Sequence, residues 1–359
     1  MFNTKALLLT ALAATLATCK SLSHLQGKAL ESSALLSLSW ELGPTNTNAS
    51  FRGLGPVSEK VAWVAGSAAT VLRTIDGGAT WASVGPSLEE ADAGLEFRDV
   101  QAFSANKAIV LSIGEGTDSR IYSTSDGGKS WSLVFQNDEP TAFYNCMDFQ
   151  SKTRGMAVSD PVDGKFRLVE TTDGGETWKI VDSSGMPEAW PGEYQFSASG
   201  TCLSTSSGRW YIASGGVDPG RVWSSDDGHN WTARNASIPG NPSAGVFSVQ
   251  FCSKKHGIAL GGDFENPTGS EHNAALSWDG GWTWKSAKRF PSGYRSGSTF
   301  LPVLPNVAFA VGPTGSDWSL DGGITWHGFD NGSFHAVECV KPWACWASGE
   351  SGRVARLTL

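Results

Sequence analysis

Short segments in which apolar and polar residues alternate recur along most of the chain. One stretch contains four of them in a row, at 97–103, 107–113, 120–124 and 130–135. Alternation with a period of two is typical of a β-strand that has one buried face and one exposed face. The pattern therefore predicts an all-β fold in which each repeating unit contributes four strands.

A short motif marks the turn between the third and fourth predicted strands of a unit. It reads Ser/Thr-x-Asp-x-Gly-x-Thr-Trp, with Ser or Asn at times in place of the second Thr, and six copies occur at intervals of 42 to 53 residues. Their aspartates are Asp76, Asp126, Asp173, Asp226, Asp279 and Asp321. A repeat of this length is typical of the four-stranded blades of a β-propeller.

The residue types in the motif suit a tight turn. Asp and Ser/Thr side chains accept hydrogen bonds from nearby main-chain groups, and Gly adopts the positive φ that such a turn needs. The Trp begins the next strand, where we expect it to pack between neighbouring blades. Six equivalent turns around a ring cannot converge on one substrate, so we predict that these aspartates are structural.

The last repeat lacks the motif and is one strand short, with predicted strands only at 334–340, 344–348 and 353–357. The segment 36–42 also alternates apolar and polar residues, and it can supply the missing outer strand. Joining the two ends of the chain in one sheet removes the exposed edges of an open array. We therefore predict a single seven-bladed β-propeller over 36–359, preceded by a signal peptide at 1–20 and a linker at 21–35.

The segments 61–67 and 70–81, which read VAWVAGS and TVLRTIDGGATW, resemble the repeats of the Asp-box, or BNR, propeller superfamily. That superfamily includes sialidases and the photosystem II stability/assembly factor-like proteins, and these segments resemble the assembly-factor repeat more than the sialidase repeat. The resemblance implies a propeller fold. For the assembly-factor-like members it also implies the binding of partner polypeptides or cofactors, although no residue of this chain indicates a cofactor of its own.

Charge and the N-terminal segment narrow the range of partners and locations. The formal net charge is −8 with no run of Lys or Arg to offset it, so general affinity for nucleic acid or an anionic membrane is not expected. Lys5 and the apolar run at 6–17 predict a secretory signal. We expect a secreted monomer without a transmembrane segment, which would be periplasmic, or lipid-anchored through Cys19, in a bacterial host.

Cysteine spacing suggests disulfides in preference to a metal site. Cys339 and Cys345 are close enough in sequence to bridge a hairpin, and Cys146 and Cys202 lie in first strands of successive repeats, which leaves Cys252 free or differently paired. No Cys-x-x-Cys pair or His cluster accompanies them, so no metal is predicted. Sequons that would be glycosylated in a secreted eukaryotic protein begin at Asn48, Asn230, Asn235 and Asn331.

A column of functional candidates follows from aligning the first strands, which line the axis of a propeller. Apolar residues six positions apart, such as Phe97 and Phe103, serve as anchors for the alignment. The column next to these anchors contains Arg52, Arg98, Tyr144, Ser199, Val246, Arg295 and His335. We expect it at one mouth of the central channel, on the side opposite the Asp turns.

The connections between second and third strands are expected at the same mouth, and they carry acidic residues that include Asp160, Asp263, Asp317 and Glu350. Two interpretations remain open. The charges can form ordinary surface ion pairs, which stabilise little. Alternatively they form a pocket for an anionic ligand, because Arg presents a planar fork that matches carboxylate, sulfate or phosphate.

Two functions from different classes are compatible with this column. The first is a ligand- or partner-binding, assembly-factor-like module for an anionic small molecule, a glycan or a partner protein. Its predicted binding residues are Arg52, Arg98, Arg295, Tyr144, His335 and Glu350. No complete catalytic signature is present, which favours this function.

The second function is a carbohydrate-active enzyme, either a sialidase-like glycosidase or a lyase that acts on uronate-containing glycans. Its candidate catalytic residues are Tyr144, Asp160, Asp263 and His335. A sialidase would use Arg52, Arg98 and Arg295 as an arginine triad, with a tyrosine nucleophile and an aspartate acid/base. The nucleophile would be Tyr144 or Tyr294, and the acid/base would be Asp160 or Asp263. A lyase would use Arg98 to neutralise the substrate and Tyr144 or His335 as the base. The missing Ile-Pro pair after Phe51-Arg52 and the seventh blade depart from the sialidase pattern.

Overall fold

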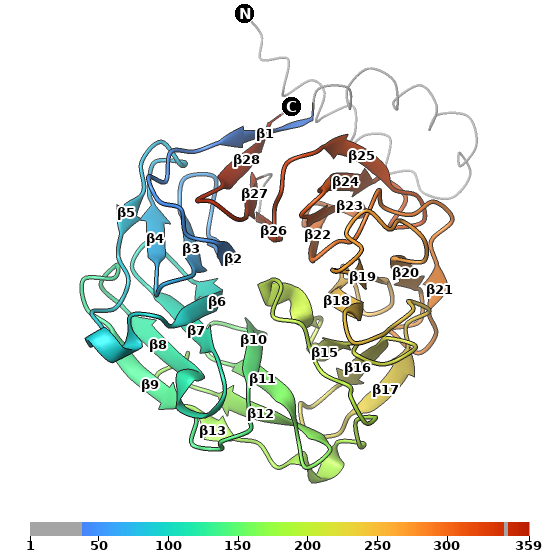
Figure 1. The fold of residues 1–359 in the computed structure, drawn as a ribbon, viewed down its shortest axis with the longest axis horizontal. Coiled ribbons are helices and arrows are strands. Elements are labelled where there is room, and N and C mark those ends of the chain that lie inside the picture. The colour runs from blue at the N-terminus through green and yellow to red at the C-terminus, as the bar shows by residue number, and fades with distance from the viewer. Residues whose placement is uncertain (1–37, 341–343, 359) are drawn as a thin grey trace, which may run out of the picture.

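Seven four-stranded antiparallel sheets are arranged around a central axis in the computed structural model, which describes residues 38–340 and 344–358 (Figure 1). In each sheet the first strand lies nearest the axis and the following strands lie progressively further out. The predicted all-β, seven-bladed propeller is thereby confirmed. The predicted signal peptide and linker lie outside the described residues.

Each blade uses consecutive strands except the last one. Blade 1 contains β2 (Phe51–Pro56), β3 (Ala62–Gly66), β4 (Val71–Thr74) and β5 (Ala82–Ser83). Blade 2 contains β6 (Glu96–Ala102), β7 (Ala108–Ile113), β8 (Arg120–Thr124) and β9 (Ser132–Gln136). Blade 3 contains β10 (Tyr144–Phe149), β11 (Gly155–Val162), β12 (Lys165–Thr171) and β13 (Lys179–Ile180). Blade 4 contains β14 (Leu203–Ser206), β15 (Arg209–Ser214), β16 (Arg221–Ser225) and β17 (Thr232–Asn235). Blade 5 contains β18 (Ala244–Phe251), β19 (Gly257–Asp263), β20 (Ala274–Ser277) and β21 (Lys285–Ser286). Blade 6 contains β22 (Gly297–Leu301), β23 (Leu304–Gly312), β24 (Gly315–Ser319) and β25 (His327–Asp330). The short 3₁₀ turns are η2 (Glu90–Asp92), η3 (Gly116–Asp118), η4 (Ser183–Gly185) and η5 (Gly200–Cys202).

Blade 7 is built from both ends of the chain. It contains β26 (Ala336–Val340), β27 (Ala344–Ser348), β28 (Val354–Thr358) and, as its outer strand, β1 (Ser39–Leu42). Ser39 pairs with Thr358 and Leu42 pairs with Ala355, so β1 runs antiparallel to β28 (Figure 1). The closure of the ring by an N-terminal strand is therefore confirmed.

The Asp turns have the hydrogen bonds that their residue types predict. In the first turn the Asp76 carboxylate accepts bonds from the main-chain N–H and the hydroxyl of Thr80, at 2.9 and 2.5 Å, and Thr74 Oγ1 accepts the Gly78 N–H at 2.9 Å. These bonds, with that of the Thr80 hydroxyl the largest contribution, lower the pKa of Asp76 to about 2. Equivalent turns form around Asp126, Asp173, Asp279 and Asp321.

The prediction that Asp226 is the turn aspartate of blade 4 is wrong by one position. Asp227 occupies that place: its carboxylate accepts bonds from the main-chain N–H of His229 and of Asn230 and from the side-chain amide of Asn230, each at 2.8 Å. Asp226 forms an exposed ion pair with Arg209 instead. The turn is one residue shorter than the others, and a motif aligned from Ser224 selects the wrong member of two adjacent aspartates.

The tryptophans that follow the turns pack at blade boundaries. Trp81 of blade 1 contacts Trp346 of blade 7 edge-on, with ring centroids 6.0 Å apart. Trp131 of blade 2 contacts Trp63 of blade 1 in the same way at 6.3 Å. The buried area of these rings stabilises the contacts between sheets.

Both cysteine pairs suggested by the spacing lie at disulfide distance. Cα atoms of Cys146 and Cys202 are 6.0 Å apart and connect blades 3 and 4, and those of Cys339 and Cys345 are 4.0 Å apart across one hairpin. Cys252 is unpaired among the described residues. Within 38–340 and 344–358 no helix is long and apolar enough to cross a membrane.

Candidate functional site at the channel mouth

Four β-bulges position the side chains at one mouth of the channel. In the pairing of β2 with β3, Phe51 faces Gly66 and Gly53 faces Ala65, so Arg52 is skipped. The same irregularity skips Arg98 in β6, Asn145 in β10 and Phe247 in β18. A bulged residue leaves the regular alternation of the strand and can point in a new direction. Three of these four residues, all but Arg98, line one cavity at the axis.

The bulges show that two residues of the column predicted at the channel mouth lie elsewhere. Tyr144 is only 2% exposed and packs edge-on against Phe135, with ring centroids 5.3 Å apart, in the core between blades 2 and 3. Val246 is also buried in the core, between blades 4 and 5. Burial raises the pKa of the Tyr144 hydroxyl. The anchors in these strands are five positions apart, as in Tyr144 and Phe149, so an alignment at six selects the residue before the bulge.

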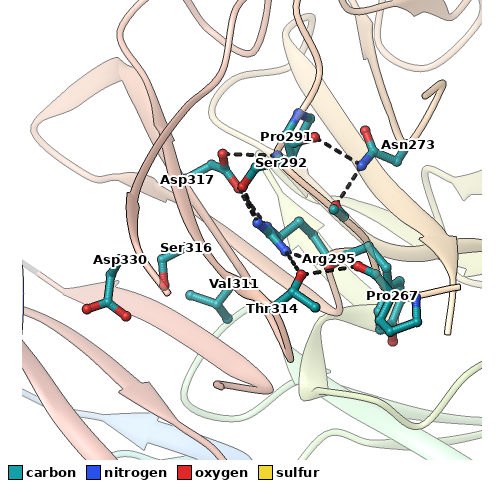
Figure 2. Close-up of polar contacts among 12 residues, drawn as sticks. Pro267, Asn273, Pro291, Ser292, Arg295, Val311, Thr314, Ser316, Asp317 and Asp330 are labelled. Carbon is teal, nitrogen blue, oxygen red and sulfur yellow. Dashed lines mark hydrogen bonds and ion pairs between the residues drawn. The ribbon is translucent and has the colours of Figure 1, made fainter. Parts of the chain in front are cut away.

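The prediction that Arg295 lies at the channel mouth is also wrong. Its guanidinium is fully buried and forms an ion pair with Asp317, with Nη2 2.6 Å from Oδ2 (Figure 2). It also donates to the carbonyl of Tyr294, to Ser292 Oγ and to Thr314 Oγ1. A guanidinium that is satisfied on every side stabilises the structure here and has no donor left for a ligand. Arg52, Arg98 and Arg295 therefore do not form a triad.

The cavity at the mouth has a volume of about 550 Å³. Its polar lining includes Arg52, Asn145, Asp160, Gln195, Ser197 and His335. Asp160 lies at the end of β11 that leads into the third strand, so the cavity opens on the side opposite the Asp turns, as predicted. Cavities of roughly 300–1,000 Å³ are typical of small-ligand sites.

One side of the cavity is cationic. Burial and the neighbouring Arg98 lower the pKa of Arg52 to about 10, and Arg52 has no ion pair within the described part of the chain. Burial, with Arg52 and Arg98 nearby, lowers the pKa of His335 to about 3, so its imidazole is neutral at neutral pH. Glu350 is exposed and close enough for its charge to act on Arg52. Arg98 pairs with Glu96 at 3.3 Å and donates to the Ser197 carbonyl.

The other side of the cavity carries an acid. Asp160 Oδ1 accepts bonds from the main-chain N–H of Gln195 at 2.8 Å and from Asn145 Nδ2 at 2.9 Å. No bond to Asp160 Oδ2 is found among the described residues, and burial raises the pKa of this carboxyl to about 7. The Gln195 side chain is almost fully buried, and its Nε2 has no acceptor in the same part of the chain.

The segment 187–199, which connects blades 3 and 4, supplies much of the lining and was missed by sequence reasoning. The Glu193 carboxylate holds it in place by accepting bonds from Arg221 Nε at 2.9 Å and Ser214 Oγ at 2.6 Å. The Arg221 guanidinium in turn lies between the rings of Trp190 and Trp223. The long interval between β13 and β14 was the available signal that this connection has a structure of its own. The contact of Glu193 with Arg221 could not be predicted, because it has no local sequence pattern.

Asp263, the remaining catalytic candidate, does not line the cavity. Its carboxylate accepts bonds from the Glu265 N–H at 2.9 Å and from Asn241 Nδ2 at 3.2 Å, as a turn residue does. Phe264 beside it reaches the cavity instead. Of the predicted site residues, the structure brings together Arg52, Arg98, Asp160 and His335, with Glu350 near Arg52.

A second cavity, of about 340 Å³, lies in the channel and is lined by three carboxyl groups that the sequence did not single out, Asp99, Asp148 and Glu338. Asp99 accepts N–H bonds from Val100 and Met147, and Asp148 accepts them from Phe149 and Thr205. The bonds from Met147 and Thr205 link neighbouring blades. No cluster of three or more His, Cys, Asp or Glu residues with metal-binding geometry occurs in the described ranges.

No family model matches the chain, and a comparison with curated proteins found no match. Among solved structures, YCF48 bound to a D1 peptide superposes with a TM-score of 0.64 at 17% identity, over 89% of this chain and 97% of that chain. YCF48 from Cyanidioschyzon merolae gives 0.60 at 17% identity, over 89% and 98%. The WD40 propeller domain of Doa1 gives 0.56 at 11% identity, over 89% and 97%. At these identities the likeness shows the propeller fold.

Proposed function

We propose that this protein is a non-catalytic binding propeller that holds an acidic group of a partner polypeptide at the channel mouth. The observation that carries the proposal is the unpaired guanidinium of Arg52, largely buried beside Arg98 and a neutral His335. Burial of a cation without a counter-charge costs free energy. A bound carboxylate would offset that cost and would use the planar fork of the guanidinium.

The choice of a polypeptide partner is supported by the similar fold of YCF48, whose structure was solved with a D1 peptide. An assembly-factor-like role would follow the same pattern: the propeller supplies a rigid ring, and loops at one mouth select the partner. The two cysteine pairs are typical of an oxidising compartment, and we include secretion in the proposal on that ground.

The carbohydrate-active alternative loses its central residues. Tyr144, one candidate nucleophile and a candidate base of that alternative, is in the core, and Arg295 is buried in its ion pair with Asp317. Tyr294, the other candidate nucleophile, lines the cavity, but it is only 4% exposed and burial raises the pKa of its hydroxyl. Asp160 and His335 do line one cavity, but no tyrosine hydroxyl among the described residues is hydrogen-bonded to an acidic partner there. The geometry therefore favours binding over catalysis.

The test measures binding of a fluorescein-labelled hexaglutamate peptide by fluorescence anisotropy at low and high salt. We expect Arg52→Gln to weaken binding at least tenfold, because it removes the cation that lacks a partner. Lys129→Gln is the matched control: it removes one charge from an exposed Asp turn on the opposite face and leaves the mouth intact. Circular dichroism establishes that both variants are folded. Equal binding by Arg52→Gln and wild type would refute the proposal.

A further inference from the structure

A cationic and an acidic side chain line the mouth cavity, and neither forms an ion pair with any of the described residues. Arg52 comes from blade 1, next to His335 of blade 7, and Asp160 comes from blade 3. Arg98, Tyr294, Glu96 and Glu350 are the titratable neighbours of Arg52. Because neither Arg52 nor Asp160 takes part in any of the ion pairs of the described residues, each is left for a group of opposite charge on a ligand.

Asp160 is oriented by the protein but not saturated by it. Both of its hydrogen bonds, from the Gln195 N–H and from Asn145 Nδ2, arrive at Oδ1. Oδ2 is left for another donor. Both neighbouring donors are neutral amides, so the Asp160 carboxylate has no positively charged partner among them. A cationic donor such as an ammonium group would supply that partner.

Gln195 belongs to the same polar wall and helps to orient Asp160. Only 3% of this residue is exposed, and its main-chain N–H donates to Asp160 Oδ1 at 2.8 Å. Its Oε1 is 3.4 Å from Asn145 Nδ2, the other donor to that carboxyl oxygen. The two amides therefore hold one oxygen of Asp160 and leave the other for a ligand.

Aromatic rings form the wall next to these polar groups. Phe196 and Phe247 are stacked with centroids 3.9 Å apart, and Tyr294 contacts Phe247 edge-on at 4.7 Å. Phe264 contacts both phenylalanines and is 47% exposed. A large exposed ring at the edge of a polar cavity is a contact surface for an apolar or aromatic group.

We propose that the mouth cavity binds a zwitterion with an aromatic side chain: its carboxylate on Arg52, its ammonium group on Asp160 and its ring against Phe247 and Phe264. The carboxylate end of this inference rests on the proposed function. Two sources carry the same chemistry, namely a free aromatic amino acid and a polypeptide segment in which an acidic and a basic side chain flank an aromatic residue.

The experiment compares three probes by isothermal titration calorimetry with the wild-type protein. L-Phenylalanine carries both charges, N-acetyl-L-phenylalanine lacks the ammonium group, and phenethylamine lacks the carboxylate. We expect loss of either charge to weaken binding at least tenfold. An N-acetylated, C-amidated tripeptide of lysine, phenylalanine and glutamate identifies the source: tighter binding than phenylalanine indicates a polypeptide, and weaker binding indicates the free amino acid.

Variants assign each charge to its partner. Asp160→Asn is expected to bind phenylalanine and N-acetylphenylalanine equally, and Arg52→Gln to bind phenylalanine and phenethylamine equally. Glu41→Gln, on the exposed side of the outer strand β1, is the control and retains the wild-type order. Because the probe comparison uses the wild-type chain, an unfolded variant does not prevent the test.

The two proposals fail in different ways. If N-acetylphenylalanine binds wild type as tightly as phenylalanine and still depends on Arg52, the zwitterion is wrong and the acidic-group site stands. If the binding of no probe depends on Arg52, both are wrong. If glycine binds as tightly as phenylalanine, the aromatic part of the inference is wrong.

Discussion

Two adjacent aspartates of blade 4 have different roles although their side chains are chemically identical. Asp227 accepts hydrogen bonds from two main-chain N–H groups and one side-chain amide, and Ser225 Oγ donates to it at 3.0 Å. Asp226 has one exposed ion pair with Arg209. The contribution of a residue to stability therefore depends on the bonds that the turn directs toward it.

We expect Asp227→Ala to lower the free energy of unfolding by about 1–3 kcal/mol, because it leaves N–H donors of the turn without an acceptor. Asp226→Ala removes one ion pair in which the carboxylate is 81% exposed, and it is expected to cost less than about 1 kcal/mol. Urea unfolding of the two variants measures the difference. Equal effects would show that the shorter turn is not held by Asp227.

At the scale of elements, β1 shows how a four-residue strand can close a large ring. Trp40 is its one buried side chain and is 8% exposed. Its rings contact Phe329 of blade 6 and Phe334 at centroid distances of 5.9 and 5.5 Å, and its Nε1 donates to Ser316 Oγ at 2.9 Å. The strand thus attaches blade 7 to blade 6 as well as completing its own sheet.

Trp40→Ala is expected to lower the free energy of unfolding by about 3–5 kcal/mol, in the range for removal of a buried aromatic ring. Glu41→Ala, one position along the same strand, points to solvent and is expected to change little. Thermal unfolding followed by circular dichroism distinguishes them. A small loss in Trp40→Ala would mean that the ring stays closed without this contact.

For the whole molecule, the channel brings together acids that are distant in sequence. Asp99, Asp148 and Glu338 come from blades 2, 3 and 7 and line one cavity. Burial raises the pKa of Asp99 and of Asp148 to about 7, and burial together with both aspartates raises that of Glu338 well above its usual value. The turn aspartates Asp76 and Asp173 are shifted in the opposite direction, to about 2.

These shifts predict an optimum of stability in mildly acidic solution. A carboxyl group whose pKa is raised by folding keeps its proton in the folded state after the unfolded chain has lost it, so its contribution falls as pH rises from about 4 to about 7. The turn aspartates contribute above their ordinary pKa and lose that contribution as pH falls toward about 2. The free energy of unfolding should therefore be highest in mildly acidic solution and should decline at both higher and lower pH.

Glu338→Gln tests the channel contribution. We expect it to raise the free energy of unfolding at pH 8 by about 1 kcal/mol or more, since it removes a buried charge and its repulsion of two others, and to change it less at pH 5. Glu41→Gln on the exposed face of β1 is the control. Denaturant unfolding at both pH values provides the measurement, and a pH-independent effect of Glu338→Gln would contradict the electrostatic explanation.

The sequence by itself determined the architecture. The six turn motifs recur at blade-length intervals, and the short last repeat together with the segment near Trp40 indicated closure by both ends of the chain. These predictions succeeded because turn chemistry and strand alternation are local, and every copy of a repeat reports the same fold. The positions of Cys146 and Cys202 followed in the same way, from their equivalent places in successive blades.

Only the tertiary structure decided the site. One extra residue in a strand moves Asn145, and not Tyr144, to the cavity, and a bulge leaves no mark in the alternation because it depends on the partner strand. Arg295 has the same side chain as Arg52, but Asp317, on strand β24 of its own blade, lies 2.6 Å from its guanidinium and removes it from the mouth. An ion pair between residues of different strands is a property of three-dimensional packing, and it separates the arginine that stabilises the fold from the one that is left for a ligand.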